Sequence, residues 1–366
     1  MRARLLNALL RETRLGELTR ATPPLAELTV QHPGVAADAP VLSSHADFLR
    51  TAPSASTRVV KLLPRAYFDG RFNVVLPRRG RIVRETDNVW REFPGRPFHT
   101  LYYWRYHYTL PSRTLDGLCM ALRSPANNYY HTLIDNLPRL YWLTQPALRD
   151  QHVRVLVPGP LRPWEAYFLP QVMPDNAELC VVEPQYLWRA EQMVVGEYLS
   201  DPMSGALPQH YLDYFLPRVL PARPRQRRHR IYISRRQAPG GRRILNEEAV
   251  RACVEAQDFT VYLLETLAIS EQIALFYDAE IVVAPHGAGI TNILFAAAIT
   301  LVELHPTRAI MPHYYFMARA MGHAYHALCA DETDRHSSFS VDVEALTQLL
   351  QQFSNDEDDA RAYEPA

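Results

Sequence analysis

The run Ile281-Val-Val-Ala-Pro-His-Gly-Ala-Gly-Ile-Thr-Asn-Ile-Leu-Phe295 decides the fold of this chain. Its first four residues form a short apolar run, which is typical of a buried strand. Two glycines follow at a tight turn, where the backbone can come close to another group. The residues from Ala288 to Phe295 then indicate a helix. A strand that passes through a glycine turn into a helix is the repeating unit of parallel α/β sheets.

The same alternation extends through the second half of the chain. Apolar strands are predicted at residues 230–234, 259–263, 281–284, 300–304 and 324–328, and helices at 247–256, 270–278, 288–295 and 313–321. Short apolar strands separated by helices indicate a parallel sheet that is covered on both faces. We therefore expect a Rossmann-like lobe.

The first half is richer in strands and less regular. Strands are predicted at 59–63, 72–76, 82–85, 101–108, 153–157, 179–182 and 193–198, with helices starting near Tyr129 and spanning 209–220. Residues 1–20 have the pattern of an amphipathic helix, and the Pro- and Ala-rich stretch up to residue 56 is expected to be loosely ordered. From Asn355 onward the chain is polar and is expected to be disordered.

A proline- and arginine-rich segment near the middle predicts a domain boundary. It follows Pro221 and is either a solvated connector or a contact for an anionic lipid or acceptor phosphate. The predicted organisation is a lead-in, an α/β lobe for the acceptor, a linker, a nucleotide-sugar lobe, and a C-terminal helix with an acidic tail. Their ranges are 1–56, 57–221, 222–230, 231–340 and 341–366.

Composition excludes several classes of protein. Lys+Arg and Asp+Glu both number 39, so no net charge favours binding to nucleic acid. Lys61 is the only lysine, which leaves no Gly-x-x-x-x-Gly-Lys phosphate loop for an ATPase. The four cysteines are scattered, which argues against a zinc site and a disulfide scaffold. Because the N-terminal stretch lacks a long apolar run, a cytoplasmic location is expected, with contact at the inner face of a membrane as an option.

Three groups of residues follow strands of the second lobe and should meet, because ligands of open parallel sheets lie at the carboxyl ends of the strands. Ser234, Arg235 and Arg236 follow the first strand; His286, Gly287, Ala288 and Gly289 follow the third; Glu303, His305 and Pro306 follow the fourth. Arginine forks and the free N–H groups of a helix start both favour a phosphate. Thr291 and Asn292 add donors in the first turn, and Glu303 is expected to bind ribose hydroxyls or to pair with a nearby arginine.

Two other interpretations of the glycine turn fail on sequence. A dinucleotide-binding fingerprint needs a third glycine where the chain has Asn292. An esterase oxyanion loop needs a Gly-x-Ser-x-Gly elbow, which the sequence does not contain.

A second polar cluster lies in the predicted helix of the first half. Asn128, His131 and Asp135 fall on one helical face, and an apolar face lies opposite them. A histidine and an aspartate four residues apart suit proton abstraction with an orienting carboxylate, but a helix cap with a surface pair has the same pattern. The single Asp-x-Asp, at Asp356 and Asp358, lies in the acidic tail, so no metal site is predicted.

Together these segments resemble glycosyltransferase family 61. The resemblance covers about residues 115–330 and lies in two blocks. The first is Asn128-Tyr-Tyr-His131 with Asp135-Asn-Leu-Pro-Arg139, and the second runs from Ile233-Ser-Arg-Arg236 through Arg243-Ile-Leu-Asn-Glu247 and Glu271-Gln-Ile-Ala-Leu-Phe276 to Pro285–Asn292 and Val302-Glu-Leu304. The chain departs from the usual pattern at Ala268, where relatives have a serine, and at Thr132.

The resemblance implies an α/β protein of GT-B type, with two Rossmann-like lobes facing across a cleft. It implies an inverting, metal-independent transfer from a nucleotide diphosphate sugar, expected to be UDP-linked, to a glycan or lipid-linked glycan in surface polysaccharide synthesis, with no further cofactor. Ser234, Arg235 and the 286–289 turn match the donor diphosphate region; Asn128, His131, Asp135 and Asn136 match the acceptor side, with Asp135 or His131 as base. The alternative is an inert nucleotide- or glycan-binding protein of the same fold.

Overall fold

The computed structural model describes residues 15–16, 23–31, 55–77, 82–88, 109–226, 229–237, 241–307, 310–331 and 337–362. These described residues fall into two compact units, the first ending at Val219 and the second beginning at Leu220. Within the described ranges, no helix combines the length and the hydropathy needed to cross a bilayer.

The second unit is built on a five-stranded parallel sheet, as predicted. Its strands are β11 (His229–Ile233), β12 (Thr260–Tyr262), β13 (Ala279–Pro285), β14 (Thr300–Pro306) and β15 (Ala324–Ala330). They lie in the order β12-β11-β13-β14-β15, and every neighbouring pair is parallel. This is the doubly wound order 2-1-3-4-5, in which the chain first moves to one side of β11 and then crosses to the other.

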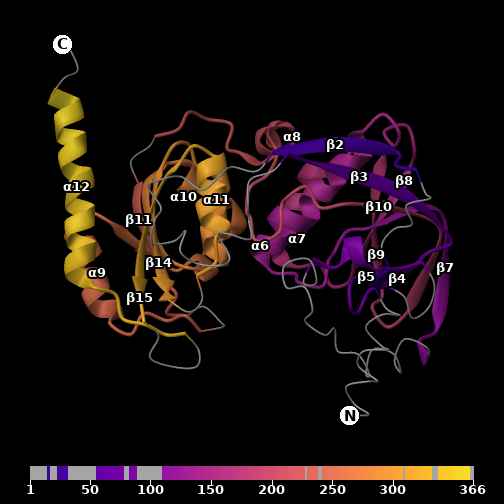
Figure 1. The fold of residues 1–366 in the computed structure, drawn as a ribbon, viewed down its shortest axis with the longest axis horizontal. Coiled ribbons are helices and arrows are strands. Elements are labelled where there is room, and N and C mark those ends of the chain that lie inside the picture. The colour runs from indigo at the N-terminus through magenta and orange to yellow at the C-terminus, as the bar shows by residue number, and fades with distance from the viewer. Residues whose placement is uncertain are drawn as a thin grey trace. The chain divides into compact units, whose positions relative to one another are not determined.

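Helices cover both faces of this sheet (Figure 1). They are α9 (Glu247–Glu255), α10 (Ile269–Tyr277), the 3₁₀ helix η5 (Ala288–Phe295), α11 (His313–Ala320) and α12 (Val343–Ala362). Val250 of α9 and Leu346 of α12 share a core with Tyr232 and Val302, so these two helices cover one face. Tyr315 and Phe316 of α11 pack on Tyr325 and Ala327 of β15 on the other. Apolar side chains on both faces of each strand explain the continuous hydrophobic runs of the sequence.

The first unit has a mixed sheet, which differs from the Rossmann-like lobe expected there. Its main path is β2 (Ala26–Gln31), β3 (Ala55–Pro64), β10 (Leu187–Gly196), β7 (Ser112–Ala121), β8 (Val153–Pro158) and β9 (Ala177–Val182). The pairs from β10 to β9 are parallel, but β2, β3 and β10 pair antiparallel. The short strands β4 (Tyr67–Asp69) and β5 (Val74–Leu76) extend the sheet from β10.

Among the described residues of the first unit, the α-helices with defined bounds are α6 (Tyr129–His131), α7 (Pro163–Val172) and α8 (Gln209–Val219). α6 continues into the π-helix η2 (Thr132–Asn136) and the 3₁₀ helix η3 (Leu137–Thr144). The predicted break at Pro138 is confirmed as this change of helix type, because proline has no N–H to donate to a continuing helix.

Several predictions at the ends of the first half were wrong. Residues 15–16 form the strand β1 (Leu15–Gly16), parallel to β6 (Ile82–Val83), instead of the predicted helix over 1–20, whose other residues lie outside the described ranges. The expected loose lead-in contains β2, which is held by its ladder to β3. The predicted strand 101–108 lies outside the described ranges, and β7 was missed because Gly117, at a φ of 76°, resembles a turn in the sequence.

The C-terminal prediction also needs correction. The acidic segment after Asn355 was expected to be disordered, but α12 continues to Ala362. Leu346 and Leu350 fix the first half of this helix in the core of the second unit, and the helix continues beyond them.

A buried histidine in the second unit gives the fold a pH dependence. His323 accepts from the N–H of Ile299 and contacts the carbonyl of Ile293 at 3.0 Å. Burial, the largest cause, lowers the pKa of His323 to about 4 from 6.5. The unfolded chain therefore binds the proton first. The contribution of His323 to the free energy of unfolding is fully present above pH 6.5. It is lost as the pH falls from 6.5 towards 4.

We expect the free energy of unfolding to fall by about 1–3 kcal/mol through this group between about pH 7 and pH 5. Urea unfolding of His323→Gln at both pH values should show a shallower dependence, because glutamine keeps a donor for the carbonyl without titrating. An equally steep dependence in the variant would assign the effect to other groups.

Candidate functional site

The strand order of the second unit marks one place for a ligand. β11 and β13 are neighbours, and the chain leaves them in opposite directions across the sheet. A crevice opens at the carboxyl ends of strands at such a switch point. Ser234 and Arg235 follow β11 there, and His286 and Gly287 follow β13. The structure thus brings the first two predicted groups, at residues 234–235 and 286–287, to one position.

Arg235 lies directly on the glycine turn. A methyl group placed on Gly287 would be 1.9 Å from Nη1 and 2.9 Å from Cζ of Arg235. The φ of Gly287 is 173°, an extended conformation that any residue can adopt. Glycine is needed here because the guanidinium of Arg235 fills the space of a side chain. Gly289 makes room for a different side chain, because a methyl group placed on it would lie 2.7 Å from Cδ1 of Leu264.

A second arginine, which the sequence analysis missed, acts on the same group. Burial is the largest cause that lowers the pKa of Arg235, and the charge of Arg242 is the next. Arg242 also lowers the pKa values of His286 and Tyr314, which places its charge near both. Like charges gathered in a part-buried position favour an anion. Arg242 has a positive φ of 56°, and the sequence carried no signal for that backbone turn.

Glu303 is held by His286. Its Oε1 lies 2.5 Å from Nδ1 of His286, and its Oε2 accepts from the hydroxyl of Tyr325 at 2.7 Å. The carboxyl group is fully buried. Neither expected role of Glu303 is therefore met: it is closed to a ribose, and the contacts found for it go to histidines and a tyrosine. It orients the ring of His286 and leaves Nε2 of that ring for a ligand.

The pKa values describe one charge state of this pair. Burial, the largest cause, lowers the pKa of His286 to about 4. Burial by itself would raise the pKa of Glu303, but His305 and His286 outweigh it and hold the value well below the ordinary range. Two lowered pKa values mean that Glu303 is ionised and that His286 is a neutral imidazole, which donates its Nδ1–H to the carboxylate.

His286, Glu303 and His305 also form the one cluster of three possible metal ligands in the described part of the chain. His305 Nε2 lies 2.9 Å from the hydroxyl of Tyr325 and 3.2 Å from Glu303. These direct contacts fill the space between the groups. Metal-bound histidines use their second nitrogen to hold an outer partner, but no described residue meets Nδ1 of His305. The donor set therefore fits a hydrogen-bonded relay better than an ion.

Apart from Arg236, the other predicted donor residues lie directly after β11 or in η5, which follows β13. Ser234 is buried, and its hydroxyl accepts from the N–H of Arg236. Thr291 lies 3.4 Å from the hydroxyl of Tyr314, beside the His286 ring. Asn292 donates to Gln272 and to the Gly289 carbonyl, so it braces the start of η5. Arg236 points elsewhere and pairs with Glu248 at the surface. Ala288 is half-buried in the first turn of η5.

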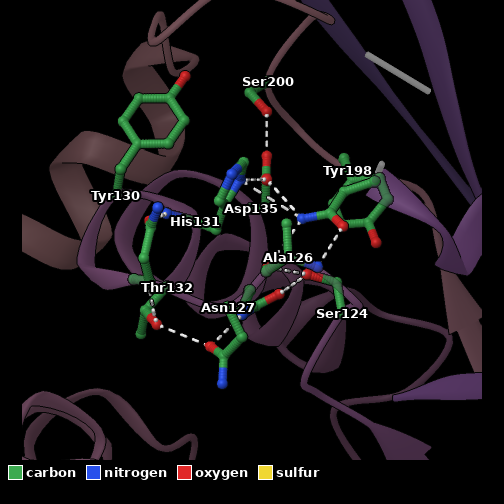
Figure 2. A network of polar contacts seen from close by, with 12 residues as sticks. Ser124, Ala126, Asn127, Tyr130, His131, Thr132, Asp135, Tyr198 and Ser200 are labelled. Atoms are coloured by element: carbon green, nitrogen blue, oxygen red, sulfur yellow. Dashed lines mark hydrogen bonds and ion pairs between the residues drawn. The ribbon is translucent and has the colours of Figure 1, made fainter. Parts of the chain in front are cut away.

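In the first unit, His131 and Asp135 form a pair, as predicted. Nδ1 of His131 lies 2.7 Å from Oδ2 of Asp135. The carboxyl group also accepts from Asn88 at 3.1 Å. Its other oxygen accepts from the hydroxyl of Ser200 at 3.1 Å (Figure 2). Asp135 is buried, whereas the His131 side chain keeps 13% of its surface exposed. The alternative of a His/Asp pair at the surface is wrong for Asp135, which lies in the π-helix η2 and is buried.

The two asparagines of this segment have supporting roles in the structure. Asn128 is the N-cap of α6, and its side chain accepts from the N–H of His131 at 3.0 Å. Asn136 is buried and accepts from the hydroxyl of Ser124 at 2.7 Å. Both fix the backbone around His131, and sequence analysis missed Asn88 and Ser200 because they come from distant parts of the chain.

Arg139 is a fully buried arginine beneath this pair. It donates to the carbonyls of Gly196 and Leu122, both at 3.2 Å, and its positive charge acts on Asp135. We expect Arg139→Met to lower the free energy of unfolding by about 2–4 kcal/mol, because buried acceptors and a buried carboxylate lose their partner. Arg154→Met, which removes a half-exposed arginine paired with Glu178, should cost much less, because solvent screens a surface ion pair. Equal losses by chemical denaturation would count against a special role for Arg139.

The fold and the switch-point site define an α/β protein with a part-buried cationic site suited to phosphate. Residues 129–302 match the family model described as Glycosyltransferase 61. The match contains the His131–Asp135 pair, Arg235 and the glycine turn. The chain is also similar to the EGF domain-specific O-linked N-acetylglucosamine transferase of Drosophila melanogaster.

The identity to this relative is 32%, and the match covers 51% of this chain and 42% of the relative. The chain thus spans less than half the length of the curated relative that it matches. The family and the relative are both glycosyltransferases.

Proposed function

We propose that this protein is an inverting glycosyltransferase that moves a sugar from a nucleotide diphosphate sugar to a hydroxyl of a glycan acceptor. The observation that supports this most directly is the contact of Arg235 with Gly287 beside His286, at the switch point of the parallel sheet. Two part-buried arginines and the amides of a helix start suit a diphosphate. The glycosyltransferase 61 match identifies the chemistry that such a site would serve.

On the donor side, the diphosphate is the leaving group, and negative charge develops on it as the sugar departs. Arg235 and Arg242 would stabilise that charge, since charge-assisted hydrogen bonds are strongest where water is excluded. No metal step is part of this proposal.

On the acceptor side, the geometry favours His131 over Asp135 as the base. Asp135 is buried and holds Nδ1 of His131, so the lone pair on Nε2 can take the proton of an acceptor hydroxyl. Asp135 would fix the tautomer and stabilise the imidazolium that forms, which is the division of roles in the hydrolase triads.

The finer parts of the proposal rest on the family resemblance. The two units would face each other as in GT-B enzymes, with the donor on the second unit and the acceptor on the first. The donor would be UDP-linked, the acceptor a glycan or lipid-linked glycan of surface polysaccharide, and the reaction would take place in the cytoplasm at the membrane. N-acetylglucosamine is the first donor sugar to test, because the relative is named for it.

The test is to incubate the full chain with UDP-N-acetylglucosamine, UDP-glucose and UDP-xylose, each with a panel of oligosaccharide acceptors, and to measure UDP release and product. Acceptor-dependent UDP release that survives a chelator is the expected result. Tight UDP binding without turnover on any pair would instead support an inert nucleotide- or glycan-binding protein.

A further inference from the structure

The ring of His286 is placed where its protonation state would decide how well a diphosphate binds. Nδ1 is held by Glu303 at 2.5 Å, and 6% of the residue stays exposed. Its neighbouring residue Gly287 contacts Arg235. A ligand anion held by Arg235 would therefore meet the other ring nitrogen, Nε2. As a neutral imidazole with Nδ1–H bound to Glu303, the ring presents a lone pair at Nε2, which repels a phosphate oxygen.

From this arrangement we infer, on the basis of the proposed function, that His286 takes up a proton when the nucleotide sugar binds and donates Nε2–H to its diphosphate. The proton comes from solvent, and no covalent bond of the protein or the ligand changes. His286 would thus bind the leaving group as an imidazolium, with Glu303 as its buried counter-charge.

The groups around the ring determine the direction of this change. Anionic Glu303 favours the imidazolium, whereas burial and the positive charges of the surroundings oppose it. The groups that face the ring are Glu303 and His305 of β14, Arg242 before α9, Arg235 after β11, and His313 and Tyr314 of α11. Tyr325 of β15 contacts the far oxygen of Glu303.

Binding of a diphosphate would offset the positive charges that disfavour the imidazolium form of His286. Each phosphate of a nucleotide sugar carries a negative charge, which offsets the charges of Arg235 and Arg242 and adds an acceptor for Nε2–H. Both changes favour the imidazolium and raise the pKa of His286 from its free value of about 4. A proton is then bound together with the donor at any pH between the free and the bound pKa values.

Buried Glu303 allows His286 to take up a proton inside the protein. A lone buried imidazolium would cost several kcal/mol, but an ionised carboxylate in direct contact compensates for it. The supporting bond from Tyr325 keeps Oε2 occupied, so that Oε1 stays directed at His286. Glu303 is a positioning residue in this scheme, because it acts on the ligand only through the histidine.

Titration calorimetry on the full chain tests the inference. UDP-N-acetylglucosamine is titrated at about pH 6.5 in buffers of different ionisation enthalpy, and the slope of the observed enthalpy gives the protons taken up per ligand. The phosphates of this probe are diesters that do not titrate near neutral pH, so the slope reports on the protein. We expect net uptake in the wild-type protein, and affinity that rises by up to ~tenfold per pH unit as the pH falls below the bound pKa.

Variants separate this residue from the other histidines. His286→Gln should abolish the uptake, and Glu303→Gln should reduce it while binding is still measurable. His326→Gln, which removes a half-buried histidine that packs on Phe353, should keep the wild-type slope. Because a buried variant can fail to fold, ¹⁵N-histidine NMR of the wild-type protein with and without the probe gives an independent reading of the His286 charge.

The outcomes are distinct for the two proposals. Donor binding with no proton uptake, and with a neutral His286 in the NMR spectrum, overturns the inference and leaves the proposed function standing. A lack of binding of all three UDP-sugars named above at any pH counts against the proposed function and removes the inference with it. Uptake that persists unchanged in His286→Gln assigns the proton to another group and also overturns it.

Discussion

Replacement of His131 by alanine is expected to lower turnover by about 10²–10⁴-fold and to leave donor affinity within about twofold of the wild-type value. The loss follows because the acceptor hydroxyl would have no base to take its proton, while the residues proposed for the donor belong to the other unit of the chain. Turnover is measured as initial rates of product formation at saturating donor, and donor affinity by calorimetry with UDP.

Asp135→Asn is the companion variant. Asparagine fits the same space and still meets Asn88 and Ser200 after an amide rotation, but it cannot balance an imidazolium at His131. Turnover should therefore fall, and the pH at which the rate reaches half its maximum should move to lower pH, because the imidazolium loses its neighbouring negative charge. A purely structural role would lower the amount of folded enzyme without shifting that midpoint.

A matched control is available in the same unit. His210→Gln removes a half-buried histidine of α8 that packs on Tyr141, away from the His131 network. Its turnover should stay near that of the wild-type protein. If His131→Ala keeps full activity, or if His210→Gln loses as much, His131 is not the base and the acceptor side of the proposal fails.

The second unit could be predicted from the sequence almost element by element. Its strands are short apolar runs, and a parallel sheet buried on both faces requires that pattern whatever the details of packing. β13 and the turn at Gly287 followed from the pattern alone, and so did the convergence of Arg235 with that turn. The rule that ligands lie at carboxyl ends of strands supplied the rest.

The first unit was harder because its elements depend on partners that are distant in sequence. β2 is a strand because β3 pairs with it, and β7 contains a glycine in a left-handed conformation. The contacts of Asp135 with Asn88 and Ser200 join residues 47 and 65 positions apart. No local periodicity reports such contacts, so the pair with His131 could be predicted and the rest of its network could not.

Glu303 shows a different limit. Its position at the end of β14 was predicted, but its direction was not, since whether a strand-end side chain faces a ligand or a neighbouring strand depends on the alternation of the pleat and on what β15 presents. Tyr325 and His305 close its second oxygen, and of these two only His305 was among the residues expected at this edge of the sheet.

Gly287→Ala is expected to weaken donor binding by about 10–100-fold although it adds only a methyl group. The φ of 173° is accessible to alanine, so the backbone need not change. The new Cβ would lie 1.9 Å from Nη1 of Arg235, so the guanidinium must leave its place. Loss of a charge-assisted hydrogen bond costs about 1.5–3 kcal/mol, which sets the size of the effect. UDP affinity by calorimetry measures it.

A double-mutant cycle distinguishes this cause from others. If Gly287 acts by making room for Arg235, Arg235→Ala alone should weaken UDP binding by at least as much, and Gly287→Ala added to it should have almost no further effect. The alanine methyl then occupies space that the arginine no longer needs. If the two losses instead multiply, the glycine contributes through its own backbone approach to the ligand, and the placement of Arg235 over the turn would not be the feature that binds the diphosphate.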